Sequence, residues 1–273
     1  MPKLPARSII VFALIPAMAI STPASAQFRG LLGNLQDRVE REIDRRAQQP
    51  QEVRTSQAGE SAANPRLRIN EGFTFVPGAT TLVEDDFAET PLGAMPASWK
   101  TNGSGSVVSV DGLDGRWLSL QSFATYKLTQ PPELPNNFTI EFDLVLAADS
   151  SRDVGSLPFG FTADNSVRSY VQDAHNDGGI AVATLGPRGS STVSSSATDY
   201  YHSFDFDYRP YANRVLHVSI AVEGDTMKVF LDKTKIGDSQ LFRSNPAKYF
   251  FISAPINMDN GANVLFGNFR IAS

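Results

Sequence analysis

The chain has 273 residues, of which 41% are hydrophobic and 19% are charged, and its formal net charge is −5. This composition is too apolar for a disordered chain and too acidic for a protein that tracks nucleic acid. The sequence contains no cysteine, which excludes disulfide scaffolds, thiolate zinc sites, iron–sulfur clusters and cysteine nucleophiles. Its three histidines, His175, His202 and His217, are too widely separated to suggest a local pair of metal ligands.

Residues 1–26 are typical of a secretory signal peptide. Lys3 and Arg7 precede an apolar stretch at 9–20, and small residues at 24–26 form a cleavage site. A membrane-spanning helix needs about 20 apolar residues, and this stretch is shorter. We therefore expect an exported protein that is periplasmic, outer-membrane-associated or secreted. The lack of cysteine favours a bacterial envelope.

An amphipathic helix is expected at residues 27–47, followed by a flexible linker at 48–69. Residues 27–69 hold eight Arg and six Asp+Glu, whereas residues 70–273 hold 14 Lys+Arg and 23 Asp+Glu. Because a helix with a narrow apolar stripe is marginal alone, residues 28–47 are expected to dock on the domain, self-associate or contact a membrane surface. A partly ordered, solvated helix is the alternative. The apolar stripe consists of Phe28, Leu31, Leu32, Leu35, Val39 and Ile43.

Beyond the linker, in residues 70–273, the hydrophobic period changes from that of a helix to that of a strand. The clearest strand is 138–146, where large apolar residues alternate with Thr139, Glu141 and Asp143. A hairpin is expected from two alternating runs at 216–222 and 227–231, joined by a turn at 223–225. Further strands are expected at 81–87, 106–110, 117–120, 158–162, 169–171, 179–185, 249–252 and 264–271.

These many short strands predict an all-β fold, an antiparallel double-sheet jelly-roll sandwich preceded by the amphipathic helix. A parallel sheet would need crossover helices, and no segment in residues 70–273 has a sustained helical period. A β-propeller is the alternative, but the chain contains no repeat of blade length.

Short aromatic and acidic phrases are spread along most of residues 73–273. They are Phe75-Val76-Pro77-Gly78, Glu84-Asp85-Asp86-Phe87, Pro96-Ala97-Ser98-Trp99, Phe138-Thr139-Ile140-Glu141-Phe142-Asp143, His217-Val218-Ser219-Ile220, Lys228-Val229-Phe230-Leu231-Asp232 and Phe266-Gly267-Asn268-Phe269-Arg270-Ile271. Together they resemble the concanavalin A-like lectin/glucanase family, close to its laminin-G-like type. The N-terminal charged helix also resembles the start of bacterial envelope proteins that carry this sandwich before a peptidoglycan-binding outer-membrane protein A-like domain.

The family that the sequence resembles includes glycoside hydrolases. Their signature places Glu-x-Asp-x-Glu, or the same with one extra residue before the last Glu, along one strand. Glu141 and Asp143 match the first two positions and lie on one face, about 6.6 Å apart. Val145 and Leu146 occupy both places for the third carboxylate. Since a retaining mechanism needs a nucleophile and a separate acid, we expect this strand not to be catalytic. The nucleophile elbow of serine hydrolases and the Gly-rich phosphate loops are also absent from the sequence.

A ligand-binding surface is expected in the stretch 199–211, which holds four tyrosines, two phenylalanines and three aspartates. Aromatic faces beside carboxylates are typical of saccharide sites. A polar loop at 173–177 is a second candidate. Alternation of aromatic and polar residues is equally typical of a sandwich strand with buried rings, and charged residues are usually just solvated. The candidate binding residues are Tyr200, Tyr201, Asp205, Asp207 and Tyr208, together with Glu141 and Asp143.

A structural calcium ion is the one cofactor that the sequence leaves open. Asp85, Asp86, Asp259 and Asn260 offer hard oxygen ligands, and sandwiches of the family often hold such an ion, but no EF-hand spacing is present.

The sequence thus predicts a non-catalytic exported protein that binds a saccharide or another envelope component and no nucleic acid. The alternatives are a structural or protein-interaction module without sugar binding and, second, a glycoside hydrolase.

Overall fold

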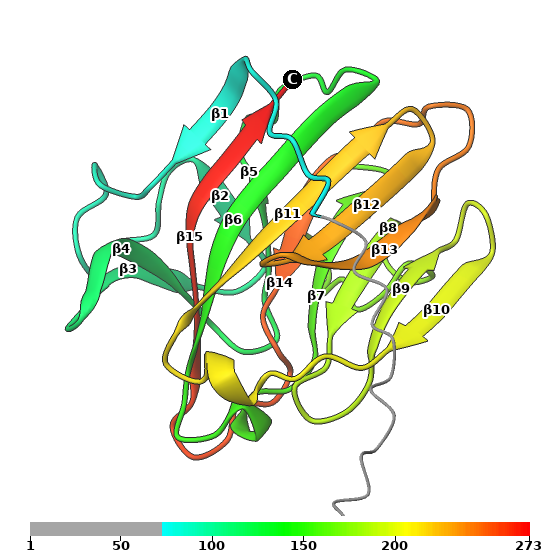
Figure 1. Ribbon diagram of the computed structural model, residues 1–273. Helices are drawn as coiled ribbons and strands as arrows, with labels where there is room; N and C mark the ends of the chain where they lie inside the picture. The colour runs from blue at the N-terminus through cyan, green and yellow to red at the C-terminus, as the bar shows by residue number, and fades with distance from the viewer. Residues whose placement is uncertain (1–72) are drawn as a thin grey trace, which may run out of the picture. The chain divides into compact units, whose positions relative to one another are not determined.

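The structure, a computed structural model, describes residues 73–273, so the expected signal peptide, amphipathic helix and linker lie outside the described residues. The described part is an all-β sandwich of two antiparallel sheets, as the strand pattern predicted (Figure 1). Within it, no helix has the length and apolar character needed to cross a membrane.

The larger sheet, sheet A, has eight strands in the order β13-β12-β11-β6-β15-β4-β3, with β1 also pairing with β15. Figure 1 shows β15, β6, β11 and β12 side by side in front of the second layer. The strands of sheet A are β1 (Thr81–Asp85), β3 (Gly105–Val110), β4 (Leu113–Leu120), β6 (Asn137–Ala147), β11 (Val215–Glu223), β12 (Thr226–Leu231), β13 (Thr234–Gln240) and β15 (Asn263–Ala272).

The second layer, sheet B, has seven strands in the order β10-β9-β8-β7-β14-β5-β2. Two short 3₁₀ helices, η1 (Ser151–Asp153) and η2 (Arg209–Tyr211), lie in connections of the described part. The strands of sheet B are β2 (Trp99–Thr101), β5 (Thr125–Leu128), β7 (Leu157–Thr162), β8 (Gly179–Leu185), β9 (Ser191–Ser195), β10 (Tyr200–Phe204) and β14 (Tyr249–Ser253).

The core lies between the two sheets and is rich in phenylalanine. On β6, the alternate residues from Phe138 to Leu144 point into this core, whereas Glu141 and Asp143 point to the outer face. Phe142 of β6 meets Phe159 of β7 edge to face, with ring centroids 5.3 Å apart. Burial of this side of β6 fixes its register, since a slip by one residue would move the carboxylates into the core.

The predicted hairpin is confirmed as β11 and β12, which pair from Val218↔Leu231 to Glu223↔Thr226. Gly224 lies in the turn with φ of 60°, a left-handed conformation that glycine adopts without a steric penalty. The hairpin places β11 directly beside β6, where His217 pairs with Asp143 and Ser219 with Glu141.

The predicted strand at 169–171 is wrong. These residues belong to the connection 163–178 between β7 and β8, which covers part of the outer face of sheet B. Side chains satisfy its backbone in place of a strand ladder: Val171 N–H donates to Thr125 Oγ1, and Val171 C=O accepts from Ser253 Oγ. Strands β2, β5, β9, β10 and β13 were not among the expected strands.

Candidate functional site

The two predicted carboxylates lie on the outer face of sheet A, at the middle of β6. The side chain of Glu141 is 20% exposed and that of Asp143 is 15% exposed. Both belong to one polar group that spans three adjacent strands and consists of Glu141, Asp143, His217, Asn268 and Arg270. We call this group the His217 cluster.

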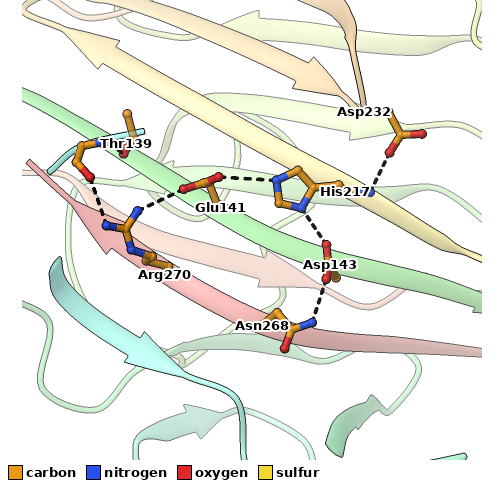
Figure 2. Close-up of polar contacts among 8 residues, drawn as sticks. Thr139, Glu141, Asp143, His217, Asp232, Asn268 and Arg270 are labelled. Carbon is orange, nitrogen blue, oxygen red and sulfur yellow. Dashed lines mark hydrogen bonds and ion pairs between the residues drawn. The ribbon is translucent and has the colours of Figure 1, made fainter. Parts of the chain in front are cut away.

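His217 of β11 lies between the two carboxylates (Figure 2). Its Nδ1 is 2.7 Å from Asp143 Oδ1, and its Nε2 is 3.5 Å from Glu141 Oε1. The backbone N–H of His217 donates to Asp232 Oδ1, and the second oxygen of Asp232 accepts from the hydroxyl of Tyr211. The imidazole is therefore held from both sides while 41% of its side chain stays exposed.

Arg270 and Asn268 of β15 complete the cluster on the other side of β6. Arg270 donates to Glu141 Oε2 at 3.2 Å, and its other nitrogens donate to Gly78 C=O and Thr81 Oγ1. Asn268 Nδ2 donates to Asp143 Oδ2 at 2.8 Å. The pairing register between β15 and β6 shifts between Gly267 and Arg270, and Asn268 has φ of 51°. Such a bulge re-aims a side chain, which here brings Asn268 to Asp143.

Charge compensation raises the pKa of His217 above its usual value of 6.5. The main cause is the hydrogen bond to Asp143; burial lowers the pKa, and the charges of Asp143 and Glu141 raise it further. With His217 protonated, two cations face two carboxylates. When His217 loses its proton, the cluster carries one net negative charge.

The cluster keeps hydrogen-bonding capacity that the protein does not use. A carboxylate offers about four acceptor positions and a guanidinium five donors. Glu141 and Asp143 each have two partners, and Arg270 uses three donors. Free acceptors and free donors therefore lie together on a partly exposed surface. A hydroxyl group of a ligand, which both donates and accepts, can bond to both.

The strand does not supply a third carboxylate. Val145 is buried with Trp117 and Leu265 in a small apolar cluster beside the site, and Leu146 belongs to the core. Gly267 is required here, because a Cβ at this position would lie 2.9 Å from the Trp117 ring. The cluster thus contains two carboxylates that share one imidazole.

The aromatic stretch 199–211 does not form the predicted binding platform. Tyr201 is 68% exposed on the outer face of sheet B, while Tyr200 packs against the core from the other face of β10. Tyr208 is only 3% exposed, and its hydroxyl bonds Ser191 Oγ. The prediction that Tyr208 lines a ligand surface is therefore wrong, because Tyr208 lies beyond β10, at the start of η2, and its ring packs into the core.

Asp205 and Asp207, the two candidate aspartates of this stretch, are exposed and lie outside the His217 cluster. Asp207 forms a salt bridge with Arg209, and these hydrogen bonds lower the pKa of Asp207 to about 2. Asp205 accepts a long hydrogen bond of 3.4 Å from Ser190.

The residues proposed for calcium have separate partners. Asp85 accepts from Ser98 and Trp99, Asp86 accepts from the backbone of Ala88, Asp259 pairs with Arg188, and Asn260 donates to Asp153. No group of three or more His, Asp or Glu that could hold a metal ion occurs within residues 73–273. Structural calcium therefore stays a prediction.

The sequence interpretation missed His217, Asn268 and Arg270 as partners of the carboxylates. All three lie in phrases that carried the family resemblance, but their role depends on strand pairing across 74 to 129 residues. Only the alternation of His217 with buried residues of β11 indicated that its side chain faces the same side as Glu141.

No family model and no curated protein matches this chain. Among solved structures, it is similar to a sialidase at 15% identity and a TM-score of 0.47, over 72% of this chain and 19% of that one. It is also similar to the carbohydrate recognition domain of Emp47p (14% identity, TM-score 0.47, 70% and 94% of the two chains). The carbohydrate-binding module CBM66 from Bacillus subtilis matches at 15% identity and a TM-score of 0.42, over 64% and 96%. The chain spans about a fifth of the sialidase, and none of these similarities assigns a ligand to it.

Proposed function

We propose that this protein is an exported saccharide-binding module and that the His217 cluster is a binding site. The observation that carries the proposal is the unused hydrogen-bonding capacity of Glu141, Asp143 and Arg270 on a partly exposed sheet face. The expected signal peptide supports export, because its charged start, apolar stretch and cleavage site are all present in residues 1–26.

The cluster suits a sugar that presents neighbouring hydroxyl groups. Each hydroxyl both donates and accepts, so it can donate to a carboxylate of β6 and accept from Arg270. The side chains are already fixed by one another, which limits the entropy lost when a ligand binds. The strands below them are held by the core, so the site is rigid.

The proposal is tested by calorimetric titration of the full chain with soluble oligosaccharides. The panel includes β-glucan fragments, chito-oligosaccharides, oligogalacturonates and peptidoglycan fragments. The variant Glu141→Gln keeps the shape of the side chain but removes its charge, and it should weaken binding at the cluster by about tenfold. Glu223→Gln is the matched control, since Glu223 lies at the end of the neighbouring strand β11 and pairs with Lys228, outside the His217 cluster.

Two other functions are outcomes of the same experiment. Silence across the whole panel would contradict saccharide binding and favour a structural or protein-interaction module. Release of reducing sugar from a panel member, lost in Glu141→Gln, would instead indicate glycoside hydrolysis. Binding without release, weakened by Glu141→Gln alone, supports the proposal.

A further inference from the structure

A second polar surface lies on the opposite side of the sandwich, on the outer face of sheet B. It contains a cavity of about 310 Å³. The floor is a row of outward residues from three strands, in which Pro158 of β7 pairs with Thr184 of β8, and Thr184 pairs with Thr192 of β9. The walls come from the connection 163–178, which contributes Gln172, and from a loop that contains Asn257. We call this surface the Thr184 groove.

Most uncharged side chains of the Thr184 groove are unpartnered in the described part of the chain. Among residues 73–273, no hydrogen bond engages the side chains of Gln172, Thr184, Thr192 or Asn257. The one carboxylate that lines the groove, Asp173, accepts from the backbone of His175 and from the side chain of Asn176. Apart from Asp173, the groove therefore presents uncharged donors and acceptors to whatever enters it.

An exposed aromatic ring stands at the rim of the groove. Phe123 is 58% exposed, and its ring stacks on Tyr170, a wall residue, with centroids 4.8 Å apart at 24°. Phe123 has φ of 60°, which is strained for a bulky residue, and its N–H donates to Pro255 C=O. Strained backbone persists only where the surrounding structure fixes it, and such residues cluster at functional sites.

The groove is preformed. The hydroxyl of Tyr170 donates to Ala254 C=O, and burial raises the pKa of Tyr170 to about 12. The next residue, Val171, is fixed through both backbone groups and packs with Ala174, Val182 and Phe251 beneath the connection. The wall that supports Phe123 is thus as rigid as the sheet.

A second exposed ring lies on the same face, toward the edge of sheet B. Thr192 of β9 pairs with Ser203 of β10, so the floor row continues to the edge strand. Tyr201 is two residues from Ser203 and points to the same outer face, 68% exposed. From β7 to β10 the row crosses three strand spacings, or about 14 Å.

We infer that the Thr184 groove binds a neutral saccharide chain. One sugar ring stacks its apolar face on Phe123, its hydroxyls pair with the threonines of the floor and with Gln172 and Asn257, and the chain extends toward Tyr201. Aromatic faces combined with uncharged polar groups recognise such a ligand, and an anionic ligand would find no cation among the lining residues. This site is independent of the His217 cluster, which lies on the other sheet.

The test is calorimetric titration of the full chain with four neutral hexasaccharides: β-1,3-glucan, β-1,4-glucan, α-1,4-glucan and chitin fragments. At least one should bind. The variant Phe123→Gly removes the ring while its backbone fits the left-handed conformation, so it should stay folded and lose about tenfold or more in affinity. Tyr201→Ala should weaken binding less. Phe73→Ala, at an exposed ring in the N-terminal segment that packs on Phe230 of sheet A, is the matched control and should change nothing.

The outcomes separate the two sites. A neutral hexasaccharide whose binding falls in Phe123→Gly but not in Glu141→Gln supports the groove, whatever the fate of the His217 cluster. Binding that falls in Glu141→Gln and not in Phe123→Gly overturns the groove and leaves the proposed function in place. Binding that neither variant affects, or silence of all four sugars, also overturns it.

Discussion

The two outer faces of this sandwich are both β-sheet surfaces, but they differ in the charge and in the pairing of their polar side chains. On sheet A, the His217 cluster is charged, and its side chains bind one another across three strands. On sheet B, the Thr184 groove has a single carboxylate, Asp173, and its uncharged side chains Gln172, Thr184, Thr192 and Asn257 lack partners in the described part of the chain. Both faces cover one phenylalanine-rich core. Burial of that core determines which residues of each strand point outward, but it does not determine whether those residues are charged or uncharged.

The contrast between the core residue Tyr208 and Tyr201 on the outer face of sheet B gives the largest expected effect. Tyr208→Ala should lower the free energy of unfolding by about 3–5 kcal/mol, because it deletes a buried ring and the partner of Ser191. Tyr201→Ala should change it by less than about 0.5 kcal/mol. Chemical denaturation of both variants measures this contrast, and equal destabilisation would show that the two tyrosines do not differ in burial.

Removal of a polar side chain should lower the free energy of unfolding more on sheet A than on sheet B. Arg270→Ala should destabilise the fold by about 1–2 kcal/mol, because Arg270 joins β15 to Glu141, Gly78 and Thr81. Thr192→Val should cost less than about 0.5 kcal/mol, since its hydroxyl bonds no protein group within residues 73–273. Denaturant midpoints test this difference. A loss in Thr192→Val as large as that in Arg270→Ala would contradict the description of the groove as unpartnered.

Because Phe123 has a positive φ, the glycine variant at this position should be more stable than the alanine variant, the reverse of the usual order. Phe123→Ala loses the stacking on Tyr170 but keeps the unfavourable positive φ. Phe123→Gly loses the same contact and relieves the strain, so it should be more stable than the alanine variant by about 1 kcal/mol. Thermal unfolding of the pair measures this difference, and a glycine variant that is less stable would remove the argument from strain.

The smallest effect concerns pH and belongs to sheet A alone. The folded-state pKa of His217 is raised by Asp143 and Glu141, so protonated His217 stabilises the fold. This contribution is fully present below about pH 6.5, the unfolded-state pKa, and is lost as the pH rises through the folded-state value. Because the side chain is 41% exposed, water screens the pair and the loss should stay below about 1 kcal/mol.

The variant His217→Gln should remove this part of the pH dependence of unfolding above about pH 6.5. The groups that face the imidazole side chain and backbone are Glu141, Asp143 and Asp232, and Tyr211 bonds Asp232. Identical profiles for the wild-type chain and His217→Gln would contradict the assignment.

The parts of the fold that the sequence predicts are those where one alternating pattern determines both faces of a strand. In β6 and in the β11–β12 hairpin, large apolar residues on one side leave a single register, so the common face of Glu141 and Asp143 was predictable. In β10, Tyr200 and Tyr201 lie on opposite faces, and the pattern cannot tell Tyr201 from a core residue.

Other features depend on contacts between distant segments. Asp143 and His217 meet only because β6 and β11 pair, and Phe123 reaches the groove only because the connection 163–178 folds over sheet B. A loop phenylalanine carries no periodic signal of its own, so nothing in the local sequence distinguished Phe123 from a core residue.

Amide chemical-shift mapping tests most directly whether the outer faces of this sandwich bind saccharides. The isotope-labelled full chain is titrated with the oligosaccharide panel while its ¹H–¹⁵N spectrum is recorded. The account predicts shifts that saturate and that map to β6, β11 and β15 around His217, or to Phe123, Tyr170, Thr184 and Thr192. A panel that leaves the spectrum unchanged, or that shifts only amides away from both faces, would contradict it.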